Sequence, residues 1–169
     1  QNPLTKFGEV CEIDVPVNPE NILPKFIDLI YSNYAVITIP NIPLYLKMAV
    51  YYECPSISKA LKHFYLDATN DETVLALAQK FLEIGLTEDA QALAPSIAKH
   101  LKKIHNKDSD LRYSIEELFE SLSPPVFAAV LNQESLKQTD ANDRIFTDED
   151  KVQYIDDFVA FQGKEDMNE

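Results

Sequence analysis

The sequence predicts an α+β protein that is mostly α-helical: a small α/β unit with short strands, followed by an irregular all-α region. Three observations support this fold class. Apolar and acidic residues alternate across Glu9–Val15, and Ala35–Ile39 holds the one dense run of β-branched residues. From Thr69 onward, the apolar residues recur only at helical spacing.

The first expected strand covers Glu9–Val15, where alternate residues beginning at Cys11 lie on one face and Pro16 ends the pattern. A helix is expected next. Asn18 is suited to be its N-cap, and its apolar stripe runs to Tyr31.

The second expected strand is Ala35–Ile39. Pro40 has no N–H to donate to a sheet, so it ends this strand as an edge strand. Asn41 can then cap a helix that ends near Cys54-Pro55, and a further short helix is expected from about Ser56.

Two long helices should follow as an antiparallel hairpin. Thr69–Glu72 is a capping box, and the helix that it opens stops at Gly85. Thr87 caps the second helix, which contains Pro95. Proline removes a backbone donor and crowds the preceding turn, so a kink is expected in this helix, with a break as the alternative.

Three more helices are expected in the remaining chain. Ser114–Glu117 is a second capping box, Ser123-Pro124 starts another helix, and Thr147 caps the last one. Residues after Gly163 should form a solvated tail. The residues of the last helix expected to face inward are Val152, Ile155 and Val159, with Phe158 as a further candidate.

Composition restricts the class of partner. The 169 residues carry a formal net charge of -13, which repels nucleic-acid phosphates and anionic membranes. No apolar run reaches the roughly eighteen residues that a membrane span needs. Cys11 and Cys54 lack metal-type spacing and are expected to be reduced thiols, which favours a cytoplasmic or nuclear protein. We therefore expect protein partners, no nucleic acid and no membrane.

No motif typical of catalysis or cofactor binding is present. With three glycines, the sequence has neither a phosphate-binding loop nor a dinucleotide fingerprint. His63, His100 and His105 lack the spacing of metal ligands and are expected to be solvated or partly buried. The acidic run Asp140–Asp150 has Ile145 where a calcium loop needs glycine. The expectation is a non-enzymatic protein with no catalytic residue, cofactor or metal.

The segment Glu12–Leu61, EIDVPVNPENILPKFIDLIYSNYAVITIPNIPLYLKMAVYYECPSISKAL, resembles the C-terminal half of a BTB (POZ) domain. That family shows a short strand, a helix that ends in an Ile-Tyr turn, a second short strand, and then a helix that closes just before a final short helix. Asn33 stands where the family has a turn glycine. The residues that fall on the family pattern are Phe26, Ile30, Tyr31, Ala49 and Leu61.

The chain beyond this segment resembles the BACK region that follows many BTB domains. Thr69–Ile104 is similar to its first helix pair, Leu122–Leu136 to its helix that begins with Leu-Ser, and FTDEDKVQYIDDFVAF to a later helix. The resemblance implies a C-terminal part of a BTB/POZ-like domain at 1–67, a BACK-like helical domain at 68–163 and a solvated tail at 164–169.

The resemblance also implies a function: a protein–protein interaction module that serves as adaptor or scaffold, including in cullin-type ubiquitin ligase assemblies. The family's hydrophobic-x-acidic cullin motif falls on Asn41-Ile42-Pro43, which lacks both the hydrophobic and the acidic member. The candidate partner-binding residues are Asn41, Ile42, Pro43 and Tyr45. A homodimer is expected only if the N-terminal half of the BTB domain precedes this chain.

Two alternatives remain open. The first is an adaptor that resembles Skp1 or elongin C, which share the BTB fold; the terminal helices of Skp1 hold an F-box. The segment IFTDEDKVQYIDDF is similar to such a helix, which begins with acidic residues. The second alternative is a helical ligand-binding or regulatory domain in which tyrosines line a pocket. Binding to a cullin or an F-box protein would separate these possibilities.

Overall fold

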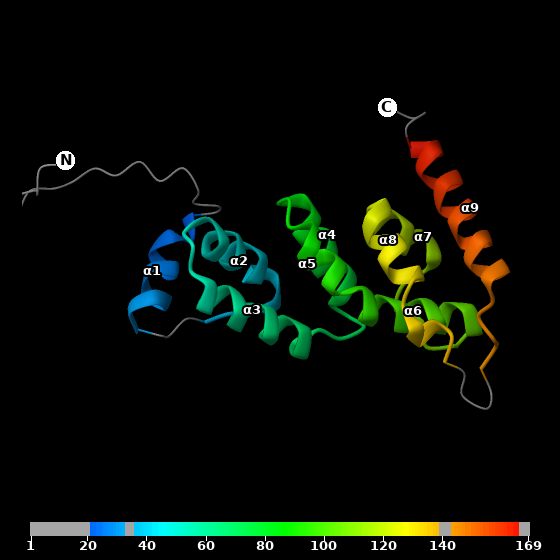
Figure 1. The fold of residues 1–169 in the computed structure, drawn as a ribbon, viewed down its shortest axis with the longest axis horizontal. Helices are drawn as coiled ribbons and strands as arrows, with labels where there is room; N and C mark the ends of the chain where they lie inside the picture. Colours follow the sequence, from blue (N-terminus) through cyan, green and yellow to red (C-terminus); the bar gives the residue numbers. More distant parts are fainter. Residues whose placement is uncertain (1–20, 33–35, 139–142, 166–169) are drawn as a thin grey trace, which may run out of the picture.

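The computed structural model describes residues 21–32, 36–138 and 143–165, and all regular secondary structure within these ranges is helical (Figure 1). The mostly α-helical fold class is thereby confirmed. The helices follow one another along the long axis of the molecule, with α1 at one end and α9 at the other. Their bounds are α1 Leu23–Ser32, α2 Ile42–Tyr51, α3 Pro55–Ala68, α4 Val74–Glu83, α5 Thr87–Ala92, α6 Ala94–Asn106, α7 Ile115–Ser121, α8 Pro124–Leu131 and α9 Asp148–Glu165.

Two short 3₁₀ turns, η2 at Ile39–Asn41 and η3 at Glu134–Leu136, complete the described elements. The first expected strand, Glu9–Val15, lies outside the described residues. The solvated tail expected at 164–169 is described only as far as Glu165, and α9 continues to that residue.

The second expected strand, Ala35–Ile39, is replaced in the described part of that segment by an irregular stretch and the η2 turn. Thr38 shows why. Its N–H donates to Asn41 Oδ1 at 2.8 Å, and its carbonyl accepts the N–H groups of Asn41 and Ile42 at 3.0 and 3.2 Å. Both backbone groups of Thr38 are therefore used inside the turn, and neither can join a sheet ladder.

The capping box expected at Ser114–Glu117 is confirmed, whereas the hydroxyl of Ser123 makes no capping hydrogen bond to α8, and Leu86 rather than Thr87 holds the cap position of α5. At the start of α7, the Ser114 hydroxyl accepts the Glu117 N–H, and the Glu117 carboxylate accepts the Ser114 N–H at 2.7 Å, as the sequence predicts. The capping box expected at Thr69–Glu72 is wrong. Asn70 Oδ1 accepts the Glu72 N–H at 2.9 Å, which forms a turn, and α4 begins only at Val74.

Pro95 splits its helix rather than kinking it. α5 ends at Ala92 and α6 begins at Ala94, with Pro95 in the first turn of α6. The carbonyl of Leu93 accepts the N–H groups of Ser96 and Ile97, so the new helix starts at this residue. An N–H in the first turn of a helix has no intrahelical partner, so proline loses no hydrogen bond there. The break is therefore more favourable than one continuous helix with Pro95 in its interior.

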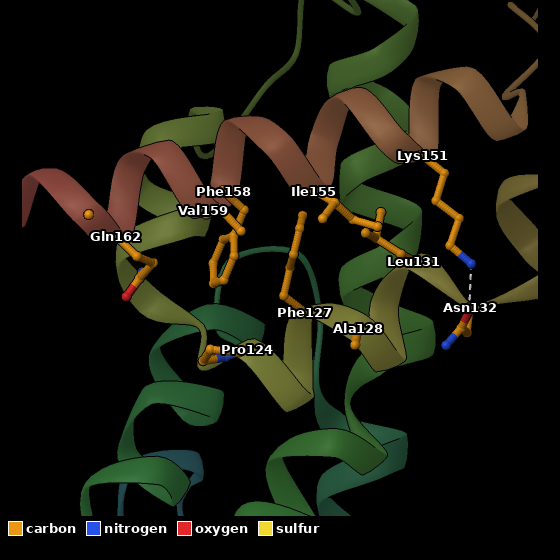
Figure 2. A pocket seen from close by; sticks show the side chains of 11 residues that line it. Pro124, Phe127, Ala128, Leu131, Asn132, Lys151, Ile155, Phe158, Val159 and Gln162 are labelled. Atoms are coloured by element: carbon orange, nitrogen blue, oxygen red, sulfur yellow. Dashed lines mark hydrogen bonds between the residues drawn. The ribbon is translucent and has the colours of Figure 1, made fainter.

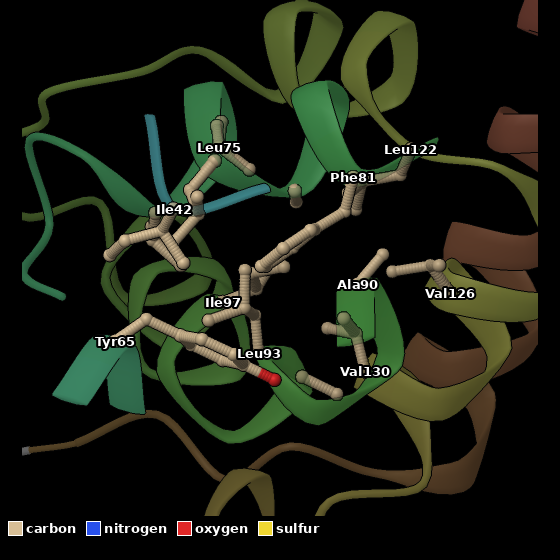
Figure 3. Packing of buried hydrophobic residues seen from close by; sticks show 14 of the residues in the cluster. Ile42, Tyr65, Leu75, Phe81, Ala90, Leu93, Ile97, Leu122, Val126 and Val130 are labelled. Carbon is tan, nitrogen blue, oxygen red and sulfur yellow. The ribbon is translucent and has the colours of Figure 1, made fainter. Parts of the chain in front are cut away.

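One hydrophobic cluster joins the helices (Figure 3). Ile42 of α2 and Tyr65 of α3 lie in the same core as Phe81 of α4, and the ring centroids of Tyr65 and Phe81 are 5.1 Å apart. This cluster continues through Leu93 and Val130 toward the C-terminal helices. The position 67/68, where the sequence places a domain boundary, is thus bridged by shared core packing.

A buried carboxylate is held within this core. Asp89 of α5 is 4% exposed; it accepts a hydrogen bond from the Tyr65 hydroxyl at 3.1 Å and pairs with Lys62 at 3.0 Å. Burial, together with the negative charge and the hydrogen bond of Asp89, raises the pKa of Tyr65 well above its ordinary value. These contacts tie α3 to α5.

Candidate partner-binding groove

The candidate residues named from the sequence lie in the core and in the turn that caps it. Ile42, Pro43 and Tyr45 are buried in α2, with Ile42 and Tyr45 no more than 1% exposed. Asn41 is half-buried, and its side chain is occupied by the Thr38 N–H. Ile42 and Pro43 are thus buried in the core, whereas Asn41 and the edge of Tyr45 line a separate hollow beside α1.

An open apolar groove lies elsewhere, between α8 and α9 (Figure 2). Its volume is about 590 Å³, which falls within the range of about 300–1,000 Å³ typical of binding pockets. The residues that line it are Pro124, Phe127, Ala128, Leu131 and Asn132 on one side, and Lys151, Ile155, Phe158, Val159, Gln162 and Gly163 on the other.

The groove exists because α9 carries two apolar stripes. Tyr154, Phe158 and Phe161 form the stripe that packs inward, with Phe158 only 4% exposed. The second stripe is Val152, Ile155 and Val159, which are 57%, 41% and 63% exposed. At 100° per residue the two stripes point roughly 130° apart, so packing one against the core leaves the other in solvent.

This arrangement corrects the expectation for the last helix. The sequence places Val152, Ile155 and Val159 inward, but they face outward; only Phe158 was placed correctly. The sequence did contain a signal for this, because the last helix has more apolar residues than one buried stripe requires. A helix attached to a globular core needs one apolar stripe, so two stripes on an 18-residue helix indicate a second contact surface.

The floor of the groove is an aromatic cluster. Phe127 of α8 stacks on Phe158 of α9, with ring centroids 4.4 Å apart and planes 20° apart. The ring of Phe119 in α7 meets both of these rings edge-on at 5.4 Å. All three rings are buried against one another, so the floor is an apolar surface that is already packed in the free chain.

Polar side chains close the two ends of the groove. At one end, Lys151 Nζ donates to Asn132 Oδ1 at 2.6 Å, which links the start of α9 to the end of α8 (Figure 2). At the other end, Gln162 Nε2 donates to the Phe119 carbonyl at 3.1 Å. The Lys151 bond therefore joins the two sides of the groove, whereas the Gln162 bond holds α9 against α7.

The start of α9 is fixed by a cap. The Thr147 N–H and hydroxyl both donate to Asp150 Oδ2, at 2.9 and 2.7 Å, and the Asp150 N–H donates to Thr147 Oγ1 at 3.2 Å. Thr147 thus caps α9, as the sequence predicts. The hydrogen bonds from Thr147 to the carboxylate hold the pKa of Asp150 below its ordinary value, with His105 and Arg144 adding smaller contributions.

Two histidines support this end of the molecule from α6. His100 and His105 are buried, whereas the sequence-based expectation for both was a solvated or partly buried ring. The His105 ring meets Phe146 edge-on at 5.1 Å, and its Nε2 lies 3.4 Å from the Ile145 carbonyl. His105 therefore packs under the segment that leads into α9.

The lining of the groove is mostly apolar, so it is suited to bury apolar side chains of a partner. Lys151 is the one charged side chain among its lining residues, and it is engaged by Asn132. Within residues 21–32, 36–138 and 143–165 no group of three or more His, Cys, Asp or Glu side chains is placed to hold a metal ion. The same ranges contain no helix with the length and apolar character to cross a membrane.

Comparisons with known proteins identify no relative of this chain. No protein-family model matches the chain, and searches of curated proteins and of solved structures find no significant match.

Proposed function

We propose that this chain is a non-enzymatic protein-interaction module that binds a partner in the groove between α8 and α9. One observation carries the proposal: Val152, Ile155 and Val159 form an exposed apolar stripe directly beside a preformed aromatic floor. Exposed apolar patches that continue into a groove are typical of interaction sites.

Burial of this stripe supplies a driving force. Covering the side chain of a valine or isoleucine completely contributes about 1.5–3 kcal/mol, and the exposed parts of these three side chains are available for such burial. Because the floor is fixed before binding, little ordering entropy is lost in α8 and α9 when the partner docks.

The role proposed for this module, adaptor or scaffold, follows from its resemblance to BTB and BACK regions. A cullin-type ubiquitin ligase is one assembly in which it would serve. The buried state of Ile42 and Tyr45 favours the α8/α9 groove over the Asn41–Tyr45 segment as the docking surface. A Skp1-like adaptor that holds an F-box helix uses the same kind of apolar contact, so the partner is left to experiment.

The test is affinity capture with a matched pair of variants. Val159→Glu places a charge in the groove, whereas Ala160→Glu places the same charge on an exposed neighbouring position of α9 outside the groove lining. Bound proteins from the native cell type are quantified by mass spectrometry for both variants and the unaltered chain. Circular dichroism confirms that both variants are folded.

We expect a set of proteins that is captured by the unaltered chain and by Ala160→Glu, and lost with Val159→Glu. Identical captures with all three chains would show that the groove is not the binding surface.

A further inference from the structure

We infer that the occupant of the α8/α9 groove is an amphipathic helix of a partner protein with lysine or arginine along one edge. This inference rests on the proposed function and adds to it the shape and charge of the partner. Two features of the described residues carry it: the length of the groove and an asymmetry of charge between its two edges.

The length of the groove fits a short helix. Its lining on α9 runs from Lys151 to Gly163, which spans about 18 Å at 1.5 Å per residue. A partner helix of three turns covers this distance and presents apolar side chains at i, i+3 or i+4, and i+7 to the stripe. An extended peptide of the same span would leave its backbone N–H and C=O groups against an apolar surface without partners.

The outer edge of the stripe is acidic. On a helix surface, neighbours lie three or four residues apart, so Val152 is flanked by Asp148, Glu149 and Asp156, and Val159 also has Asp156 as a neighbour. All three carboxylate residues are exposed. A partner helix in the groove therefore has a row of negative charge beside one of its edges.

The opposite edge, on α8, is uncharged. Its lining side chains are Pro124, Ala128 and Asn132 together with the floor residues Phe127 and Leu131. The cation of Lys151 is already engaged by Asn132 at the closed end. The complementary partner is thus positive on the edge beside α9 and neutral on the edge beside α8.

A second copy of this chain fits the groove poorly. A twofold contact places the same patch of both copies face to face, so the acidic edges of two α9 helices would approach each other. The whole chain carries a net charge of -13, which adds to this repulsion.

The test selects helices from a displayed library and reads the charge at each position. The probe is a set of 14-residue peptides with fixed leucines at i, i+3, i+4 and i+7, and with every other position drawn evenly from Lys, Glu, Ser and Ala. The full chain is used for selection, and binders retained by Val159→Glu are removed from the count. Affinities of selected peptides are measured by fluorescence anisotropy at low and high salt.

A matched pair of charge reversals separates local from overall attraction. Asp156→Lys and Asp67→Lys change the net charge equally, but Asp67 lies on α3, with its side chain 72% exposed and far along the chain from the groove. Both reversals are exposed, so both chains should fold.

We expect lysine to be enriched on one flank of the leucine stripe and affinity to fall with salt. Asp156→Lys should weaken the selected peptides roughly 3- to 10-fold, and Asp67→Lys less than about 2-fold. Peptides sensitive to Val159→Glu but with no bias toward lysine would overturn this inference and leave the proposed function standing. A selection that yields no Val159-dependent peptide overturns it too, as does a dimer in sedimentation equilibrium that Val159→Glu dissociates.

Discussion

Phe158 of α9 stacks on Phe127 of α8 with ring centroids 4.4 Å apart, and this pair is both the joint between the two helices and the floor of the groove. The adjacent residue, Val159, is 63% exposed. Neighbouring positions on one helix therefore separate stability from binding, which makes their substitution informative.

Phe158→Ala is expected to lower the free energy of unfolding by about 3–5 kcal/mol, because it leaves a cavity beneath the groove and removes the stacked ring. Val159→Ala should change it by no more than about 0.5 kcal/mol, since little buried surface is lost there. Urea denaturation followed by circular dichroism measures both. Equal effects of the two substitutions would contradict the assignment of the two stripes.

Thr147→Ala is expected to lower the free energy of unfolding by about 1 kcal/mol at pH 7, because Thr147 caps α9 through Asp150. The pKa of Asp150 is below its ordinary value of 3.8 in the folded chain. The stabilisation that this shift represents is therefore present above pH 3.8 and is lost as the pH falls through the folded pKa. The difference between the two chains should narrow on acidification.

Urea denaturation at pH 7, 5 and 3 gives this comparison. Thr87→Ala is the control, because Thr87 is the first residue inside α5 and Leu86 holds the cap position. A Thr147→Ala deficit that stays constant down to pH 3 would argue against a role for the Asp150 carboxylate.

Tyr65→Phe is expected to cost about 1 kcal/mol at pH 7, because the hydroxyl donates a buried hydrogen bond to Asp89. The pKa of Tyr65 is raised above its ordinary value of 10.0 in the folded chain. Its contribution is fully present below pH 10 and is lost as the pH rises, because the phenol ionises first in the unfolded chain.

The unfolding free energy of the unaltered chain should therefore fall more steeply above pH 10 than that of Tyr65→Phe. Denaturation curves at pH 7 to 11 measure the slope. Tyr31→Phe makes the same chemical change at a side chain that is 83% exposed, and it should leave the stability at pH 7 unaltered. Parallel slopes for Tyr65→Phe and the unaltered chain would refute the burial of this phenol.

Ile42→Ala is expected to destabilise the chain by about 2–5 kcal/mol, because the side chain is fully buried. Asn41→Ala should cost about 1 kcal/mol through loss of its hydrogen bond to the Thr38 N–H. Thermal unfolding measures both changes. If Ile42 served only as a contact for a partner, its replacement would leave the free chain as stable as before.

Local signals were the ones that could be read from the sequence. The caps at Ser114 and Thr147 depend on residues three positions apart, and both form as predicted. The capping box predicted at Thr69–Glu72 has the same three-residue spacing but does not form, because the Asn70 side chain accepts the Glu72 N–H instead. The strand expected at Ala35–Ile39 failed for a related reason, since Asn41 engages the Thr38 N–H that a sheet would need.

The sequence by itself determined that this chain is mostly helical, where several of its helices begin, and that α9 carries more apolar surface than one contact requires. Tertiary structure alone decided which stripe of α9 is buried. The periodicity of Val152, Ile155 and Val159 is as good as that of Tyr154, Phe158 and Phe161. The second set is buried because Phe158 and Phe161 pack on Phe119, and Phe158 also stacks on Phe127. Phe119 and Phe127 lie 31 or more positions before these two rings in the chain, so no local pattern records the contacts.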